Sequence, residues 1–366
     1  MRILMIKLKH IGDTLLMTPA IRFLRQQFPE SKIYVVVRRG CEEILEGNPD
    51  IDGVLGIAHF DRAGRSWTQS LKELVHLFQM LRGGRFDYAF DLSDSDRAKW
   101  IIFLTRARHR VVNRWHARLG WKEKLYTDFS DFAWGREHMV KKDFRTVADL
   151  FDPTASPGPL VFKTTIMGWN SAREKLSLEP EKFIVFHPTT RWSFKGWLPE
   201  RWAQLADWTY QQLGFSVLFS CGPNPKEKVA IEMILRHAKS HHYATWGRLS
   251  LHELGCVLEK AKLFVGIDSA AMHLAAAVGC PVVALFGPSS EWSWHPWHCH
   301  YEIVLGRCEC KKTRKFVCDK SRPYPCMEDI GVERVVGAIT SILSIEVRQR
   351  TSMPKTSNKA SAQVYQ

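Results

Sequence analysis

Long uninterrupted apolar segments are absent from this sequence of 366 residues. The most hydrophobic stretch, 263–287, contains Asp268, His273 and Pro281, so it predicts a strand, a helix and a second strand joined by turns, not a membrane span. Residues 1–7 predict a β-strand, without the longer apolar stretch and small-residue cleavage site of a signal peptide. We therefore expect a cytoplasmic protein with reduced cysteines.

Several motifs are missing as well. The sequence has no glycine-rich Walker motif, no paired C-x2-C zinc arms and no recognised nucleic-acid-binding module. Four cysteines near the carboxyl end have the spacing C-x-C-x7-C-x7-C: Cys308, Cys310, Cys318 and Cys326. Their basic surroundings favour thiols in a surface loop, and a metal or disulfide role stays open.

Acidic residues are scarce relative to basic ones, since 38 Asp and Glu stand against 52 Lys and Arg and leave a net charge of +14. This excess indicates an anionic partner: phosphate, nucleic acid or a lipid surface. Residues 97–142 contain 12 Lys and Arg against 4 Asp and Glu, with interleaved tryptophans at 100, 115, 121 and 134. This stretch is either a binding surface or a solvated helical face.

The remaining composition is ordinary for a globular protein, with 45% hydrophobic and 25% charged residues, which excludes extensive disorder and collagen. Apolar runs predict strands at 3–6, 33–37, 54–57, 88–92, 183–186, 216–220, 263–266 and 282–286. Helical periodicity predicts helices at 15–28, 71–81, 202–213, 226–237, 251–261, 273–278 and 332–343. The alternation predicts an α/β protein in which both halves are doubly wound.

Domain limits follow from the turn-rich segment 152–159 and from the restart of the strand–helix rhythm. We predict a first domain at 1–170, a second at 171–331 and a final helix at 332–344. The polar, basic tail at 345–366 is expected to be disordered.

The first motif, Lys7 to Asp13, follows the first strand. Ligands of open α/β sheets bind at this carboxyl edge of the strands. Gly12 permits close approach of the backbone, and the Asp13 carboxylate can act as a general base. Asp13 can equally stabilise the start of the following helix, and both roles stay open.

Two further motifs follow strands of the second half. Thr189, Thr190 and Lys195 lie in one loop, where two hydroxyls and an ammonium suit a diphosphate; the alternative is a solvated loop. The segment 268–273 opens a helix with small residues that leave its N–H groups accessible to an anion. Asp268 and His273 are then ligand contacts, or simply a helix cap and a core histidine.

Taken in order, these motifs resemble the bacterial ADP-heptose:lipopolysaccharide heptosyltransferases, glycosyltransferase family 9. The resemblance extends from residue 2 to 344 and is carried by residues 9–19, 86–94, 189–197, 221–223 and 266–288. The Gly-Asp pair, the Phe-Lys-x-Trp loop and the Asp-Ser-Ala segment look most like the core heptosyltransferase III subgroup.

The resemblance implies the GT-B fold, in which two Rossmann-like doubly wound domains face each other across a cleft. The acceptor then binds the first domain and the nucleotide sugar the second, and the last helix packs back on the first domain. By position, Asp13 matches the proposed base. The positions that match donor contacts are Thr189, Thr190, Lys195, Leu249, Asp268, Ser269, Ala270 and His273, with Leu249 at the adenine pocket. The acidic contact to the ribose is less clear, with Glu227 and Asn224 as candidates.

The reaction implied is an inverting transfer of L-glycero-D-manno-heptose from ADP-heptose to the anionic inner core of lipopolysaccharide, with Asp13 as the general base. The resemblance implies that the reaction needs neither a metal nor a cofactor. It also implies that the protein lies peripherally on the inner face of the inner membrane and that nucleic acid is not a partner. The alternatives are a GT-B glycosyltransferase for a UDP- or GDP-sugar, a sugar-nucleotide epimerase, and a non-catalytic protein that binds anions or nucleic acid.

Overall fold

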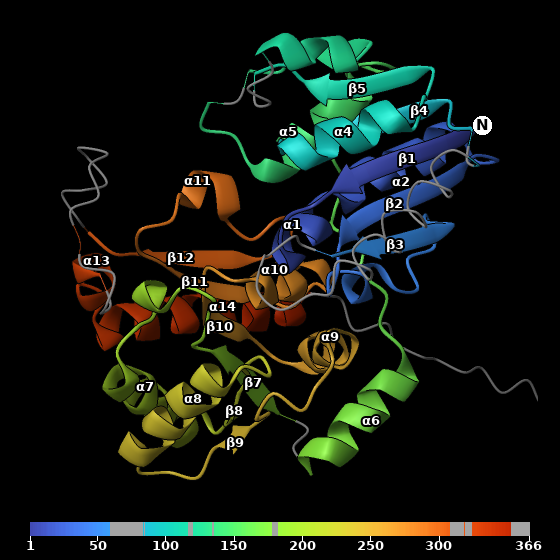
Figure 1. Ribbon diagram of the computed structural model, residues 1–366. Helices are drawn as coiled ribbons and strands as arrows, with labels where there is room; N and C mark the ends of the chain where they lie inside the picture. Colours follow the sequence, from blue (N-terminus) through green and yellow to red (C-terminus); the bar gives the residue numbers. More distant parts are fainter. Residues whose placement is uncertain are drawn as a thin grey trace, which may run out of the picture.

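The computed structural model describes residues 1–58, 83, 85–115, 120–133, 135–177, 182–307, 318 and 324–352 (Figure 1). These residues form two six-stranded parallel sheets with helices on both faces of each. The helix predicted at 71–81, Trp134, Cys308, Cys310 and the chain beyond residue 352 lie outside the described residues.

The first sheet consists of strands with apolar runs that are buried on both faces. In spatial order its strands are β3 (Gly53–Ile57), β2 (Lys32–Arg38), β1 (Arg2–Lys7), β4 (Tyr88–Asp91), β5 (His109–Asn113) and β6 (Asp128–Ser130). Ile3 and Met5 pack with α2 (Thr18–Gln27) and α5 (Met139–Ala148), whereas Leu4 packs with α4 (Asp96–Leu104) on the other face. This division follows from the two-residue period of a strand.

The second sheet is built in the same way. Its spatial order is β12 (Tyr301–Leu305), β11 (Val282–Phe286), β10 (Phe264–Ile267), β7 (Phe183–His187), β8 (Ser216–Phe219) and β9 (Tyr243–Ala244). Its helices are α6 (Ile166–Leu176), α7 (Pro199–Leu213), α8 (Pro225–His237), α9 (Leu251–Lys260), α10 (Ala270–Ala277), α11 (Glu291–Trp294) and α13 (Pro325–Glu328). Figure 1 shows α7 and α8 on one side of this sheet and α9 on the other.

Both sheets have the same topology. Counted from its own first strand, each has the order 3-2-1-4-5-6, which is the Rossmann order. The chain therefore changes direction across the sheet between β1 and β4 in the first half and between β7 and β10 in the second. The structure confirms the predicted α/β architecture of two doubly wound Rossmann-like domains, the GT-B fold.

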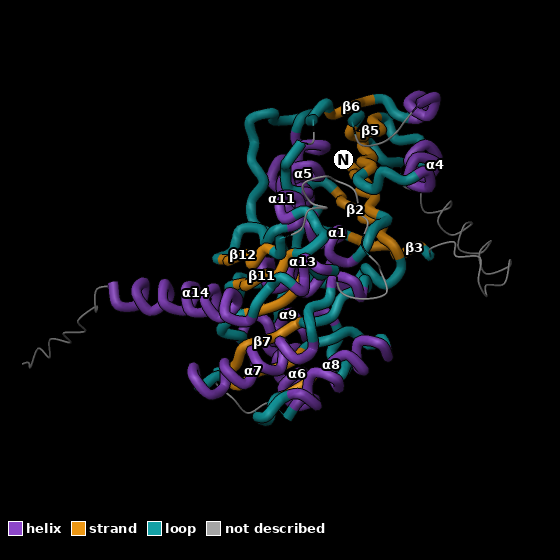
Figure 2. Tube along the Cα trace, turned by 90° about the vertical axis from the view of Figure 1, so that its left-hand side faces the viewer, coloured by secondary structure: helices purple, strands orange, loops and turns teal. Residues whose placement is uncertain are grey.

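The two halves meet through helices that follow their central strands. Helix α1 (Ile11–Leu16) comes directly after β1, α10 follows β10, and the two helices pack together. Leu15 and Leu16 belong to the same apolar cluster as Ala271 and Met272. The carboxyl edges of the two sheets consequently face one another, with α1 and α10 between them (Figures 1 and 2).

Helix α6 packs with the second half. The Thr165 side chain caps it by accepting a hydrogen bond from the Gly168 N–H at 3.0 Å. Farther along, Ser171 and Lys175 each bond Glu253 of α9 at 2.6 Å. Residue 170, where the first domain was predicted to end, lies inside this helix.

The last helix corrects the prediction for the end of the chain. Helix α14 (Val332–Ser352) packs on β12, β11 and α7 of the second half, and among the described residues its main contacts do not include the first domain. Its side chains at Val335, Ile339 and Ile342 share one face and join the apolar cluster of the second sheet. The helix also includes residues 345–352, which were expected to be disordered, and Figure 2 shows its far end projecting from the molecule.

Candidate active site

Asp13 lies at the point where the first sheet changes direction. It occupies the third position of α1, and its Oδ2 accepts a hydrogen bond from the His10 N–H at 3.3 Å. The helix-stabilising role considered for this residue is therefore real. Within the described part of the chain, the other carboxylate oxygen of Asp13 accepts no hydrogen bond, and the side chain is half-buried. One oxygen thus remains available for a proton.

A network of buried charges lies beneath Asp13. The Lys7 ammonium is 2.5 Å from Asp143 Oδ2, and both side chains are 1% exposed. Burial acts to lower the pKa of Lys7, but the carboxylates of Asp143 and Asp13 outweigh it and hold that pKa above its ordinary value. Asp94, which follows β4, forms ion pairs with Lys142 and Lys9. Burial acts to raise the pKa of Asp94, but these lysines hold it below its ordinary value.

The corresponding point of the second sheet holds the loop after β7. Lys195 belongs to a short 3-10 helix, Ser193–Lys195, and its Nζ is 2.7 Å from Oδ2 of Asp268, directly after β10. The Thr189 hydroxyl donates to Glu227 Oε2 at 2.7 Å. The Gly222 N–H donates to the same oxygen at 2.8 Å. Glu227, considered as a ribose contact, therefore lies beside the predicted phosphate-binding threonine.

The amino end of α10 carries polar atoms that lack protein partners. Ser269 Oγ and His273 Nδ1 are buried there, and neither has a hydrogen-bond partner among the described residues. In the loop after β11, Ser289 Oγ is likewise buried without such a partner. Such atoms are rare in folded proteins. A helix amino terminus with accessible N–H groups is a natural anion site. Together these features suit the phosphates of a nucleotide.

His273, on α10 of the second half, interacts electrostatically with one carboxylate from each half. Burial lowers its pKa below the ordinary value, although the carboxylates of Asp268 and Asp13 act to raise it, so the imidazole is neutral at pH 7. A Cβ atom on Gly12 would lie 3.2 Å from His273 Cδ2 and 3.5 Å from Ala270 Cα. The close approach predicted at Gly12 is therefore an approach of α1 to α10.

The structure thus brings most of the predicted residues together. Asp13 and Gly12 from the first half lie beside Ala270 and His273, and Lys195 bonds Asp268. Thr190 is half-buried next to Thr189. Leu249 is half-buried in the loop between β9 and α9, where it packs on the main apolar cluster. Over the described ranges, no three His, Cys, Asp or Glu side chains are arranged to hold a metal ion.

Ser289 and Arg191 were not predicted as site residues. Ser289 follows β11, and its position beside other strand ends was the available signal. Arg191 Nη1 crosses to His10 of the first half, 3.1 Å from its Nδ1. No local pattern reveals such a contact, because it depends on how the two halves pack.

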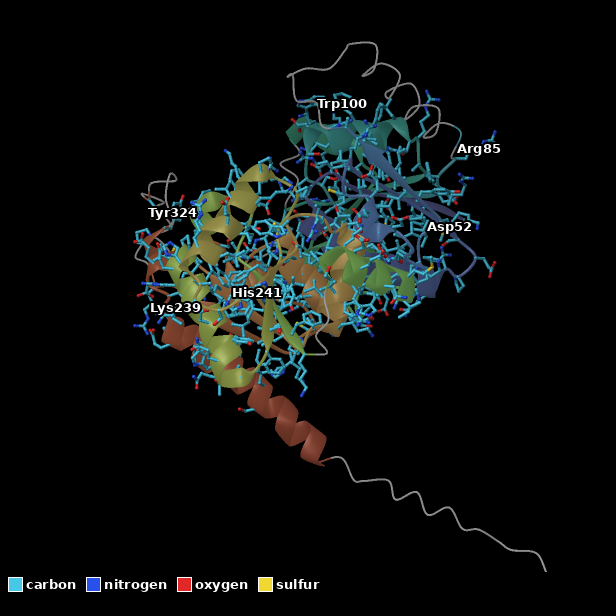
Figure 3. All side chains as sticks on the ribbon, turned by 90° about the horizontal axis from the view of Figure 1, so that it is seen from below. Asp52, Arg85, Trp100, Lys239, His241 and Tyr324 are labelled. Atoms are coloured by element: carbon cyan, nitrogen blue, oxygen red, sulfur yellow. The ribbon has the colours of Figure 1, made fainter. Side chains whose placement is uncertain are left out.

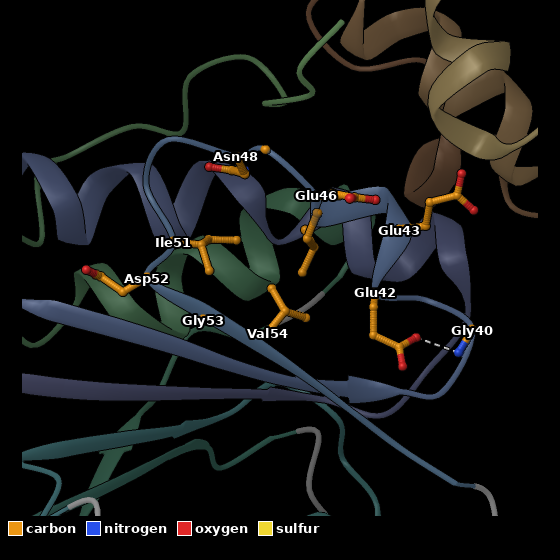
Figure 4. A pocket seen from close by; sticks show the side chains of 11 residues that line it. Gly40, Glu42, Glu43, Glu46, Asn48, Ile51, Asp52, Gly53 and Val54 are labelled. Carbon is orange, nitrogen blue, oxygen red and sulfur yellow. Dashed lines mark hydrogen bonds between the residues drawn. The ribbon is translucent and has the colours of Figure 1, made fainter. Parts of the chain in front are cut away.

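Two cavities lie away from these residues. One of about 620 Å³ is lined by carboxylates of the β2–β3 connection, including Glu43, Glu46 and Asp52. Glu42 lines it too and accepts a hydrogen bond from the Gly40 N–H at 2.5 Å, drawn as a dashed line in Figure 4. The other, of about 490 Å³, is lined by arginines at the amino edge of the first sheet. Within the described ranges, no helix is both long enough and apolar enough to cross a bilayer.

Comparison with known proteins agrees with this architecture. Lipopolysaccharide heptosyltransferase 3 of Escherichia coli K12 is 29% identical over 92% of this chain and 96% of its own length. A glycosyltransferase family 9 crystal structure from Veillonella parvula has a TM-score of 0.78 at 21% identity, covering 94% of this chain and 97% of that one. The structure of E. coli ADP-heptose lps heptosyltransferase II has a TM-score of 0.74 at 22% identity, covering 95% and 100%.

The sequence model of glycosyltransferase family 9 (heptosyltransferase) matches residues 74–322, more than half of the chain. Residue types, strand-end positions and overall fold all agree with this match. The chain belongs to glycosyltransferase family 9, the heptosyltransferase family.

Proposed function

We propose that this protein transfers a heptose from ADP-heptose to the inner core of lipopolysaccharide, with inversion at the anomeric carbon and Asp13 as the general base. The contact of α1 with α10 carries the proposal, because it sets Asp13 beside the helix that would hold the nucleotide. The E. coli relatives are named for lipopolysaccharide and, in one case, for ADP-heptose. We assign the same substrates to this chain.

The donor is assigned to the second half. The diphosphate would lie at the amino end of α10, within reach of the Lys195 ammonium and the hydroxyls of Thr189 and Thr190. The ribose would face Glu227, and Leu249 would line the adenine pocket. Negative charge develops on the β-phosphate as the sugar–phosphate bond breaks, and the lysine and helix dipole stabilise that charge. These groups would supply the positive potential without a divalent cation or a cofactor.

The acceptor hydroxyl approaches from the first half. It attacks the anomeric carbon on the face opposite the ADP, and the carbon–oxygen bond to ADP breaks as the new bond forms. A hydroxyl is a poor nucleophile at neutral pH, so Asp13 takes its proton during the attack. The free carboxylate oxygen of Asp13 is the group that would accept it. The products are the extended glycan and ADP.

A surface on the first half suits an acceptor embedded in a membrane. Trp100, Phe103 and Trp121 are 46%, 44% and 64% exposed, and the Trp100 ring lies 6.5 Å from that of Phe103 and 6.2 Å from that of Trp121. Figure 3 places Trp100 on the outer surface of this half. This aromatic patch belongs to the stretch 97–142, whose net charge is +8. Exposed aromatics among cations favour peripheral binding to the anionic cytoplasmic leaflet.

Mass spectrometry provides the direct test. The protein is incubated with ADP-heptose and a panel of truncated core lipopolysaccharides in EDTA, and a gain of one heptose on an acceptor is expected. Asp13→Asn should lower kcat by about 10²–10⁴ while leaving the ADP dissociation constant within twofold. No gain on any acceptor, with transfer from a UDP- or GDP-sugar instead, would overturn the donor assignment. A loss of ADP affinity in Asp13→Asn as large as its loss of kcat would contradict the role of Asp13 as base.

A further inference from the structure

Two arginines from different halves converge on one histidine next to Asp13. Arg38 ends β2 of the first half, and its Nη1 lies 3.3 Å from Nδ1 of His10. Arg191 lies in the loop after β7 of the second half, and its Nη1 is 3.1 and 3.2 Å from the two ring nitrogens of His10. Both Arg191 and His10 are exposed, so the group is open to solvent.

The positive charges of the two arginines are not balanced by a carboxylate within the described residues. An imidazole offers at most one acceptor nitrogen, and here two permanently charged guanidiniums approach it. In the described part of the chain, neither Arg38 nor Arg191 forms an ion pair with a carboxylate. Glu42, four residues after Arg38, bonds the Gly40 N–H instead (Figure 4). The other cations of the site differ, since Lys7, Lys9, Lys142 and Lys195 all pair with aspartates.

We propose that Arg38, His10 and Arg191 form a clamp that binds an anionic group, phosphate or carboxylate, of the acceptor glycan. Guanidinium forks bind such groups through paired, charge-assisted hydrogen bonds. The assignment to the acceptor rests on the proposed function and on two observations. Arg38 and His10 belong to the first half, and the donor diphosphate already has Lys195 and the amino end of α10.

The position of the clamp gives it a role in orienting the acceptor. The backbone N–H of His10 bonds Asp13 Oδ2 at 3.3 Å, so one residue of the clamp directly contacts the proposed proton acceptor. A glycan anchored there presents neighbouring hydroxyls to Asp13. Because Arg191 comes from the second half, the same anion contacts both halves at once. The clamp therefore selects acceptors by the distance between their charged group and the attacked hydroxyl.

Binding of delipidated core oligosaccharide, measured by calorimetry in the presence of ADP, tests the proposal without requiring transfer. Three probes are compared: the native oligosaccharide, its dephosphorylated form and its carboxyl-reduced form. Arg38→Gln and Arg191→Gln should each weaken binding of the native probe about 10- to 100-fold, the loss expected for hydrogen bonds to a charged group. Arg236→Gln, which removes an equal charge from the exposed face of α8, should bind like the wild type.

The anion is identified by which modified probe, dephosphorylated or carboxyl-reduced, loses affinity. Wild-type protein should bind that probe about 10- to 100-fold more weakly than the native oligosaccharide. The two arginine substitutions should not weaken binding of that probe any further. Variants that bind every probe like the wild type would overturn the clamp. A loss of ADP affinity equal to the loss of oligosaccharide affinity would assign these arginines to the donor instead. Arginine-dependent binding without heptose transfer would leave the clamp standing and refute only the reaction.

Discussion

Lys195 allows a quantitative test of the donor site, because its ammonium is held by a carboxylate that the nucleotide would approach. Lys195 Nζ lies 2.7 Å from Asp268 Oδ2, and the two side chains are 21% and 12% exposed. Under the proposed function, Lys195→Met would remove a hydrogen bond to phosphate from a charged donor, worth about 1.5–3 kcal/mol. It also leaves the Asp268 carboxylate uncompensated, and two like charges about 5 Å apart repel by about 3 kcal/mol at an effective dielectric constant near 20.

The expected result is a loss of ADP affinity of about 100- to 1,000-fold, since these two effects overlap in part. The double variant Lys195→Met/Asp268→Asn removes the repulsion and should regain about 10-fold or more of that loss. Isothermal titration with ADP measures both variants. Lys175→Met is the matched control, because this lysine pairs with Glu253 at the packing of α6 on α9. Unchanged ADP affinity in Lys195→Met, or a double variant that binds no better than the single one, would refute the reasoning.

Three further predictions concern stability, pH and membrane binding. Lys7→Met leaves the Asp143 carboxylate buried without its cation and should lower the unfolding free energy, measured in urea, by about 3–5 kcal/mol. The double variant Lys7→Met/Asp143→Leu should regain most of that loss. Equal stability of the single and double variants would contradict a buried ion pair. Burial lowers the pKa of His187 from 6.5 to about 4, so the unfolded chain takes up a proton first. The stability from this group is therefore complete above pH 6.5, and about 3 kcal/mol is lost by pH 4. His187→Asn should make the urea midpoint of unfolding less dependent on pH between these values. An unchanged pH dependence of the midpoint would count against this explanation. Trp100→Ser/Trp121→Ser should reduce cosedimentation with anionic vesicles about 10-fold, whereas the control Tyr210→Ser on α7 should not. Equal binding of the double variant and the control would remove the aromatic patch from the membrane contact.

The central strands were predictable because burial on both faces demands continuous apolar runs. Phe183–Phe186 and Val282–Phe286 carry that pattern and form β7 and β11. The strands β5 and β6 were not predicted. His109–Asn113 has two apolar residues and Asp128–Ser130 has one, so their extended form depends on pairing outward from β4. Pairing with a partner distant in the sequence leaves no local signal.

The site was predictable to the extent that it lies at strand ends. Asp13, Lys195 and Asp268 each follow a strand, and the parallel order of the sheets places those ends at shared edges. The pairing of Lys195 with Asp268 and the crossing of Arg191 to the first half required the packed structure. Helix α14 shows the same limit. Its apolar spacing indicates a buried face, but does not tell which sheet covers it.

The contact between α1 and α10 also constrains how this enzyme can diverge. A Cβ atom on Gly12 would lie 3.2 Å from His273 Cδ2, so a larger residue there requires the His273 side chain or α10 to shift by a few tenths of an ångström. A substitution at Gly12 therefore acts directly on the packing of α1 against α10. The outer surface of α4 stands apart from this contact. Substitutions on that surface can therefore change what the first half presents to solvent without altering the packing of α1 on α10.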